Sequence, residues 1–247
     1  MSQAARNKEE LVLWETTPEG VTILTMNLPR RYNGWTQPML VRLRDSLLTA
    51  AKDTHTRALI LTGADPYYCA GVNLSSTLKI DHPRVLHEFI RSQNEALFNM
   101  FIDFPKPILI AVNGPAIGAS VTSATLCDAI IASQQATFST PFARLGVTPE
   151  GCSSVLFPRL IGQRNAHRML GAEGWIPTAA EALEIGLVDR VVPHESLREQ
   201  AIALATAFLS PPFLKGQFDF LMSRQKYGPA AMFFLLWRTH PLWSMLL

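Results

Sequence analysis

Short runs of consecutive apolar residues alternate along the chain with longer stretches in which apolar residues recur every three or four positions. The runs at residues 21–26, 57–63, 107–112 and 129–132 predict buried strands, and a further short strand is predicted at 188–192. The longer stretches at residues 38–53, 83–104 and 116–126 have helical spacing and predict helices. Because strands and helices alternate, we expect an α/β core.

From about residue 164 onward the pattern is mainly helical. Thr178 and Glu181, three residues apart, form the signature of a capping box and predict a helix that ends at Gly186. Further helices are predicted at 195–209 and 214–225, and a very apolar run follows at 232–237. As an isolated helix this run would expose a large apolar surface, so we expect it to pack on the core or on another subunit. We therefore predict a core at residues 1–195 and a C-terminal helical cap and oligomerisation region at 196–247.

Composition supports a folded protein. The chain has 247 residues, of which 48% are apolar and 17% charged, whereas charged residues usually make up about 25%. A disordered chain has low hydrophobicity and high net charge, so disorder is excluded. The scarcity of charge suggests that other subunits or a partner cover part of the surface. The net charge of +2 and the scattered basic residues give no reason to expect nucleic acid as a partner.

The cysteines, the two ends of the sequence and one long uncharged segment indicate where the protein resides in the cell. The cysteines, Cys69, Cys127 and Cys152, are too few for a disulfide framework, so we expect a reduced intracellular environment. Residues 1–15 lack the apolar segment of a secretory signal, and the last three residues are not a peroxisomal SKL-type signal. Residues 107–127 are uncharged and long enough to span a bilayer, but a turn at residues 113–115 interrupts them. We predict a strand, a turn and a helix there, and no membrane span.

Several chemistries are excluded by missing motifs. The chain has neither GxGxxG nor GxxxxGK[ST], and its six histidines lack the HExxH spacing, so we expect no nucleotide-cradling loop of these kinds and no metal site. Ser120 follows Gly118 with the spacing of a nucleophile elbow, but the second glycine of that motif is missing. We therefore expect Ser120 to be a small residue that packs within a helix. Cys152 is expected to be a buried structural thiol, because no histidine stands near it in sequence to act as its base.

Two glycine-containing segments, residues 67–74 and 112–120, follow predicted strands and could present free backbone N–H groups. Two such donors that converge on one point would form an oxyanion hole. Each segment taken alone is better explained as an ordinary tight turn, because glycine-containing turns are common.

Glu150 is the only acidic residue between positions 129 and 172. Apolar surroundings raise the pKa of a carboxyl group and suit it to general base catalysis. A glutamate in an exposed loop or at the start of a helix is the commoner situation, so this segment alone favours that interpretation over a general base.

Six segments, in this order, resemble the crotonase superfamily, also called the enoyl-CoA hydratase/isomerase superfamily. They lie at residues 27–34, 69–74, 106–114, 127–128, 159–162 and 179–188, and the resemblance runs from about residue 12 to residue 209. It implies a spiral of ββα units with a C-terminal helical cap, and homotrimers or dimers of trimers. It also implies acyl-CoA substrates, no cofactor besides the coenzyme A of the substrate, and a soluble intracellular protein, in the peroxisome or the mitochondrial matrix.

The resemblance also implies a site. The oxyanion hole would use the backbone N–H groups of Val72 and Ala119, which follow glycines in the matched motifs. The other expected substrate-binding residues are Asn33, Gly34, Ala70, Gly71, Asn73, Leu74, Gly118 and Phe142.

Departures from the family pattern narrow the expected reaction. Hydratases of this family use two glutamates to activate water, and the corresponding positions here are Thr122 and Phe142, which cannot transfer a proton at neutral pH. Glu150 lies in a segment that resembles the acid-bearing segment of the peroxisomal-type Δ3,Δ2-enoyl-CoA isomerases, which use one catalytic glutamate. We therefore predict an enoyl-CoA isomerase of fatty acid β-oxidation. The alternatives are another crotonase reaction, such as hydration or thioester hydrolysis, and a non-catalytic scaffold that binds acyl-CoA.

Overall fold

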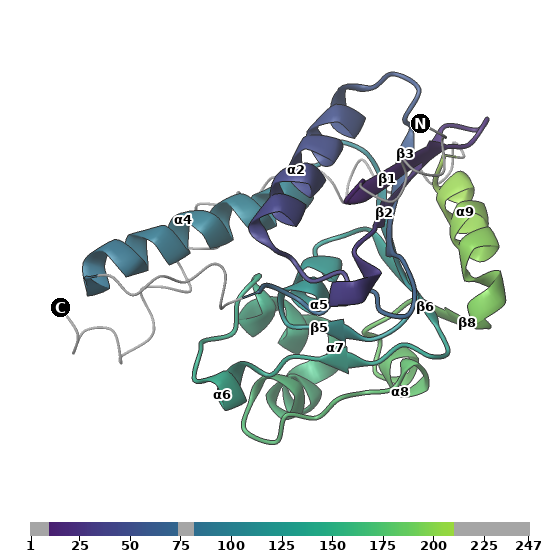
Figure 1. Ribbon diagram of the computed structural model, residues 1–247. Coiled ribbons are helices and arrows are strands. Elements are labelled where there is room, and N and C mark those ends of the chain that lie inside the picture. Colours follow the sequence, from purple (N-terminus) through teal and green to yellow (C-terminus); the bar gives the residue numbers. More distant parts are fainter. Residues whose placement is uncertain (1–9, 74–81, 210–247) are drawn as a thin grey trace.

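The computed structural model describes residues 10–73 and 82–209. Its main sheet has six strands in the order β1-β2-β3-β4-β6-β8 (Figure 1). The strands are β1 (Val12–Thr16), β2 (Val21–Met26), β3 (Ala58–Gly63), β4 (Ile108–Val112), β6 (Ala129–Ser133) and β8 (Arg190–Val192). β1 pairs antiparallel with β2, and every other neighbouring pair in this sheet is parallel. The five predicted strands are confirmed, whereas β1 was not predicted.

A second sheet and the helices complete the described part of the chain. Strands β5 (Ala116–Ile117) and β7 (Phe138–Ser139) form a two-stranded parallel sheet. The helices are η1 (Pro29–Arg31), α2 (Gln37–Lys52), α4 (Pro83–Ile102), α5 (Ala119–Ala124), α6 (Phe142–Leu145), α7 (Ser153–Leu170), α8 (Ala179–Glu184), η2 (His194–Ser196) and α9 (Leu197–Phe208). The predicted alternation of strands and helices is thus confirmed.

The main sheet is covered on both faces. One face packs against α9, through Leu197, Ala201, Ala205 and Phe208. The opposite face packs against α2 and α4, and the N-terminal part of α4 extends away from the body of the protein (Figure 1). Because both faces are buried, the strands read as continuous apolar runs instead of alternating polar and apolar residues.

The predicted capping box lies at the start of α8. The Glu181 N–H donates to the Thr178 hydroxyl at 3.3 Å, and the Glu181 carboxylate accepts the Thr178 N–H at 2.8 Å. Gly186 then leaves the helix with a φ of 80°, a left-handed value that favours glycine. The local sequence therefore sets both ends of this helix.

The prediction of one helix over residues 116–126 is wrong. Ala116 and Ile117 form β5, because they pair with Phe138 and Ser139, and α5 begins only after Gly118, which has a φ of 63°. The part of α7 before residue 164 was not predicted. Its apolar pattern is interrupted by Pro158 and by Gly162, whose φ of 79° breaks the helical backbone.

Part of the predicted C-terminal cap lies outside the described residues, including the helix at 214–225 and the apolar run at 232–237. The described portion of that region, α9, packs against the main sheet. The division into a core at 1–195 and a cap at 196–247 therefore stays a prediction.

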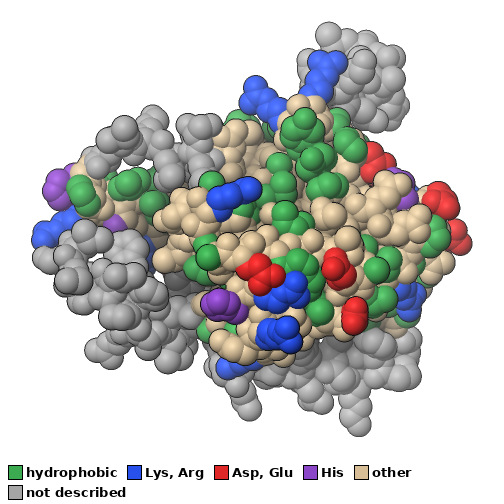
Figure 2. Space-filling model, turned by 90° about the horizontal axis from the view of Figure 1, so that it is seen from below, with side chains coloured by type: hydrophobic (Ala, Val, Ile, Leu, Met, Phe, Trp, Pro, Cys, Tyr) green, Lys and Arg blue, Asp and Glu red, His purple; other side chains and the backbone are tan. Residues whose placement is uncertain are grey.

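No helix among the described residues is long and apolar enough to cross a membrane. The uncharged residues 107–127 form β4, β5 and α5 instead. Figure 2 shows the face on which α6, α7 and α8 lie, where acidic, basic and apolar side chains are intermixed.

Candidate active site

The two glycine-containing segments lie side by side. The Ile117 N–H donates to the Cys69 carbonyl at 3.0 Å, and the Ser120 hydroxyl donates to the same carbonyl at 3.1 Å. Gly71 has a φ of 79°, and a Cβ atom on it would lie 2.4 Å from the Ile117 carbonyl oxygen and 3.8 Å from the Ala119 nitrogen. Only glycine fits this position, which allows the two backbones to approach each other. Ser120 is therefore a packing residue, as expected.

Two backbone N–H groups have no acceptor among the described residues where these segments meet. The N–H groups of Val72 and Ala119 donate no hydrogen bond within residues 10–73 and 82–209. Val72 directly follows the glycine that approaches Ile117, and Ala119 is the first residue of α5. The segments thus bring together the two donors that the sequence predicted for an oxyanion hole.

Two asparagines support the loop that precedes Val72. The buried Asn33 side chain donates to the carbonyls of Ala64 at 2.6 Å and Tyr67 at 2.7 Å, and it accepts the Leu28 N–H at 2.9 Å. Asn113, at the end of β4, also donates to the Tyr67 carbonyl, at 3.3 Å. These bonds fix residues 64–67 before the chain enters the Cys69–Val72 segment.

Glu150 lies in a tight turn against α4 and α5. Gly151 and Cys152, with φ values of 62° and 61°, form two consecutive left-handed residues. A Cβ atom on Gly151 would lie 2.5 Å from the Thr122 hydroxyl oxygen and 2.6 Å from the Phe98 ring. The Glu150 carbonyl accepts both the N–H and the hydroxyl of Ser153, at 3.2 and 2.7 Å. The turn therefore packs Gly151, the residue after Glu150, against Thr122 of α5, three residues after Ala119.

Burial raises the pKa of the Glu150 carboxyl group to about 7, and a hydrogen bond from Asn94 acts in the opposite direction. Asn94 and Phe98 are four residues apart on α4, so they lie on the same face of that helix. Asn94 meets the Glu150 side chain, and Phe98 meets the neighbouring Gly151. A carboxyl group with a pKa near neutrality exchanges protons readily in both directions, as a general base must.

The remaining predicted substrate-binding residues occupy several environments. Gly34 lies close to Gly71, because a Cβ atom on Gly34 would lie 3.7 Å from the Gly71 carbonyl oxygen. Ala70 and Asn73 are partly exposed and continue the same segment. A Cβ atom on Gly118 would meet no atom of the described residues within 4 Å. Leu74 lies outside the described residues.

Phe142 begins α6 and is buried. The apolar side chain that packs next to the Glu150 turn is Phe98, which the sequence did not single out. Asn94 and Phe98 are more than fifty residues before Glu150 in sequence, so no local motif connects them to it.

A second group of polar side chains has the residue types of a hydrolase triad. His194 Nδ1 lies 3.1 Å from the Ser133 hydroxyl, and His194 Nε2 lies 3.2 Å from the Asp65 carboxylate. Ser133 is fully buried, and its hydroxyl already accepts the Gln135 N–H at 3.1 Å. A substrate cannot reach this hydroxyl, so the group braces β6 and η2 against the loop after β3.

The described cysteines and histidines offer no further site. Cys152 is buried, as predicted, and burial raises the pKa of its thiol to about 11, which makes it a poor nucleophile. Within the described ranges, no three His, Cys, Asp or Glu side chains are grouped so that they could hold a metal ion.

Comparison with known proteins agrees with this architecture. Residues 16–225 match the model of the enoyl-CoA hydratase/isomerase family. The chain belongs to that family. Its members include a solved enoyl-CoA hydratase/isomerase from Pseudoalteromonas atlantica, which is 29% identical and superposes with a TM-score of 0.76, over 90% of this chain and 87% of the other. The predicted crotonase-like α/β fold is thereby confirmed.

Two curated members of the family are named as isomerases. Human enoyl-CoA delta isomerase 2 is 38% identical over 202 residues, which are 80% of this chain and 50% of the human protein. Mouse peroxisomal enoyl-CoA delta isomerase 3 is 32% identical over 235 residues, which are 91% of this chain and 70% of the mouse protein. The chain thus matches only half of the human relative's length.

Proposed function

We propose that this chain is a Δ3,Δ2-enoyl-CoA isomerase, which moves the double bond of a 3-enoyl-CoA to the trans-2 position. Glu150 would be the only base. The backbone N–H groups of Val72 and Ala119 would bind the thioester oxygen.

The reaction needs one proton to be removed and the same proton to be returned. The Glu150 carboxylate takes a proton from C2 of the acyl chain. The electron pair of the broken C2–H bond forms a double bond between C1 and C2, and the π pair of the thioester carbonyl moves onto its oxygen. The two N–H groups stabilise the resulting dienolate, which is usually the largest catalytic contribution in such a site. Glu150 then gives the proton to C4, and the double bond forms between C2 and C3. One carboxyl group can reach both carbons on one face of the acyl chain.

The observation that carries this proposal is the environment of Glu150. The carboxyl group is partly buried beside α5, with a pKa of about 7, and Asn94 is the hydrogen-bond partner that orients it. Near neutral pH this group is ionised often enough to accept a proton, and its conjugate acid can return it.

Hydration is the weaker candidate, because water addition in this family uses two carboxylates. Thr122 packs directly against Gly151, so a hydroxyl group stands at the first of these positions. The buried Phe142 stands at the second. Solved relatives named as hydratases share the fold, so the fold alone does not separate the two reactions.

The test is an assay of the purified protein with 3-hexenoyl-CoA, in which the conjugated 2-enoyl product is followed by its absorbance. The proposal expects steady conversion without an added cofactor. Binding of acyl-CoA without any conversion would favour a non-catalytic scaffold. Release of free coenzyme A would favour thioester hydrolysis.

We also propose a place in fatty acid β-oxidation, on the basis of the resemblance to the isomerases of this family. One of them is named as peroxisomal. We propose that the product is passed to a reaction that consumes trans-2-enoyl-CoA, in the peroxisome or the mitochondrial matrix.

A further inference from the structure

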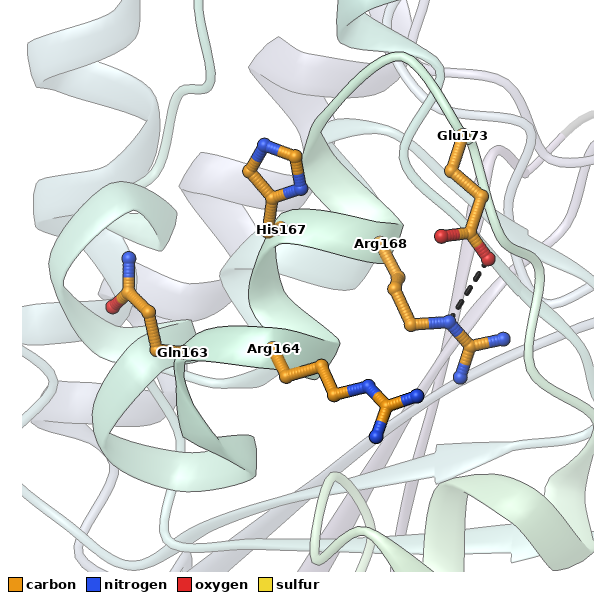
Figure 3. Close-up of a pocket in the computed structure, with 5 residues that line it drawn as sticks. All are labelled: Gln163, Arg164, His167, Arg168 and Glu173. Atoms are coloured by element: carbon orange, nitrogen blue, oxygen red, sulfur yellow. Dashed lines mark hydrogen bonds and ion pairs between the residues drawn. The ribbon is translucent and has the colours of Figure 1, made fainter.

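An open pocket of about 690 Å³ lies along the second half of α7 and the turn that follows it (Figure 3). Its lining residues are Gln163, Arg164, His167, Arg168 and Glu173. None of them contributes to the Glu150 turn or to the Val72 and Ala119 segments. The pocket is therefore distinct from the candidate active site.

Arg168 is held in one orientation. Its Nε donates to the Glu173 carboxylate at 2.9 Å, and its guanidinium carbon lies 3.8 Å from the centre of the Trp175 ring. Its two Nη groups form no hydrogen bond with the part of the chain that the structure describes. A fixed guanidinium with free donors binds an anion at a low entropic cost.

Arg164 adds a second guanidinium on the same side of α7. The two arginines are four residues apart, and Figure 3 shows both side chains extending toward the same side of the helix. Arg164 is exposed and forms no ion pair with any residue in the ranges 10–73 and 82–209. Its positive charge is thus available to a ligand.

The lining is rich in donors and poor in acceptors. Gln163, Arg164, His167 and Arg168 all carry N–H donors, and the only carboxylate of the lining, Glu173, already binds Arg168. The Glu181 carboxylate, which also interacts with Arg168, accepts the N–H and the hydroxyl of Thr178 in the capping box. A ligand with several acceptor oxygens and a negative charge would satisfy these donors.

We propose that this pocket binds a phosphate group. Arginine pairs match the geometry of phosphate oxygens and form strong charge-assisted hydrogen bonds with them. The pocket is open to solvent, so the bound phosphate can be an ion or part of a larger phosphate ester. The proposal does not depend on the isomerase activity.

The test is calorimetric titration of the full chain with inorganic phosphate at constant ionic strength. Arg164→Gln should weaken binding about tenfold or more, because a charge-assisted hydrogen bond is lost. The phosphate affinity of Arg164→Lys should lie between the affinity of Arg164→Gln and that of the parent. The matched control is Arg159→Gln, an exposed arginine on the same helix outside the pocket, which should bind as the parent does. Failure of the parent to bind phosphate, or equal binding by Arg164→Gln, would overturn the proposal.

Two further titrations identify the source of the phosphate. If Arg164→Gln weakens binding of coenzyme A but not of 3′-dephospho-coenzyme A, the pocket binds the 3′-phosphate of the substrate. If it weakens phosphate binding and leaves both coenzymes unaffected, the ligand is a separate phosphate ester. Both results support a phosphate site, and neither requires turnover.

Discussion

Gly71 and Ile117 are packed so closely that a Cβ atom on Gly71 would lie 2.4 Å from the Ile117 carbonyl oxygen. Gly71 precedes Val72, and Ile117 lies two residues before Ala119. This contact therefore sets the separation of the two N–H groups that we propose as the oxyanion hole.

Gly71→Ala should lower kcat about 100-fold, since loss of one oxyanion donor has an effect of this order. The added methyl group would push the two segments apart and displace the Val72 N–H. The measurement is isomerase turnover, together with thermal unfolding to establish that the variant folds. Gly174→Ala is the matched control, because Gly174 has a φ of 60° but open space around its Cβ position. A folded Gly71→Ala protein with parental kcat would contradict the proposed role of this contact.

The pH dependence of kcat/KM should follow the ionisation of Glu150. Burial raises the pKa of this group from 4.5 to about 7, so the base is protonated and inactive at low pH, and kcat/KM should rise as pH increases through about 7. Asn94→Leu removes the hydrogen bond that lowers this pKa, so the rise should move to higher pH. Ser92→Ala, a substitution at an exposed position of the same helix, should not shift the pH dependence of kcat/KM. An Asn94→Leu profile identical to that of the parent would show that Asn94 does not act on the base.

Some of this arrangement follows from local sequence, and some does not. The strands of the main sheet and the cap of α8 were predicted because apolar runs and the Thr178–Glu181 pair act over a few residues. Strand β5 was missed because it depends on pairing with Phe138 and Ser139, about twenty residues away. The first part of α7 was missed because the helical pattern is broken at Gly162.

The candidate site, too, could be predicted only in part from local sequence. Glu150, Val72 and Ala119 were identified from motifs, but the residues that surround the base were not. Asn94 reaches Glu150, and Phe98 reaches Gly151, only because α4 crosses the turn, which is a tertiary contact. The brace formed by Ser133, His194 and Asp65 joins three distant segments and has no sequence signature.

Hydration of 2-enoyl-CoA should be absent or very slow compared with isomerisation. The positions of the two water-activating carboxylates are occupied by Thr122 and the buried Phe142. The measurement is loss of the conjugated enoyl absorbance when trans-2-hexenoyl-CoA is the substrate. A hydration rate comparable to the isomerase rate would require a second base that this account does not contain.

We expect the protein to self-associate, with a trimer as the favoured state. The basis for self-association is the low share of charged residues, 17%, and the apolar sequence at residues 232–237, which lies outside the described residues. The trimer is what the resemblance to the crotonase superfamily implies. Light scattering of the purified full chain measures the mass directly. A stable monomer of 27.4 kDa at working concentration would refute this expectation.

The most direct test of the central claim is the turnover of Glu150→Gln, which keeps the size and shape of the side chain but removes the base. General base catalysis contributes roughly 10²- to 10⁴-fold, and a sole base that serves both proton transfers should lie at the upper end of this range or beyond it. Affinity for an acyl-CoA should stay within a few-fold of the parent, since the proposed substrate contacts come from other residues. Glu184→Gln, an exposed glutamate on α8, should behave as the parent does. A collapsed kcat with retained binding is the result that the account predicts. A Glu150→Gln enzyme that kept most of its isomerase rate would contradict it.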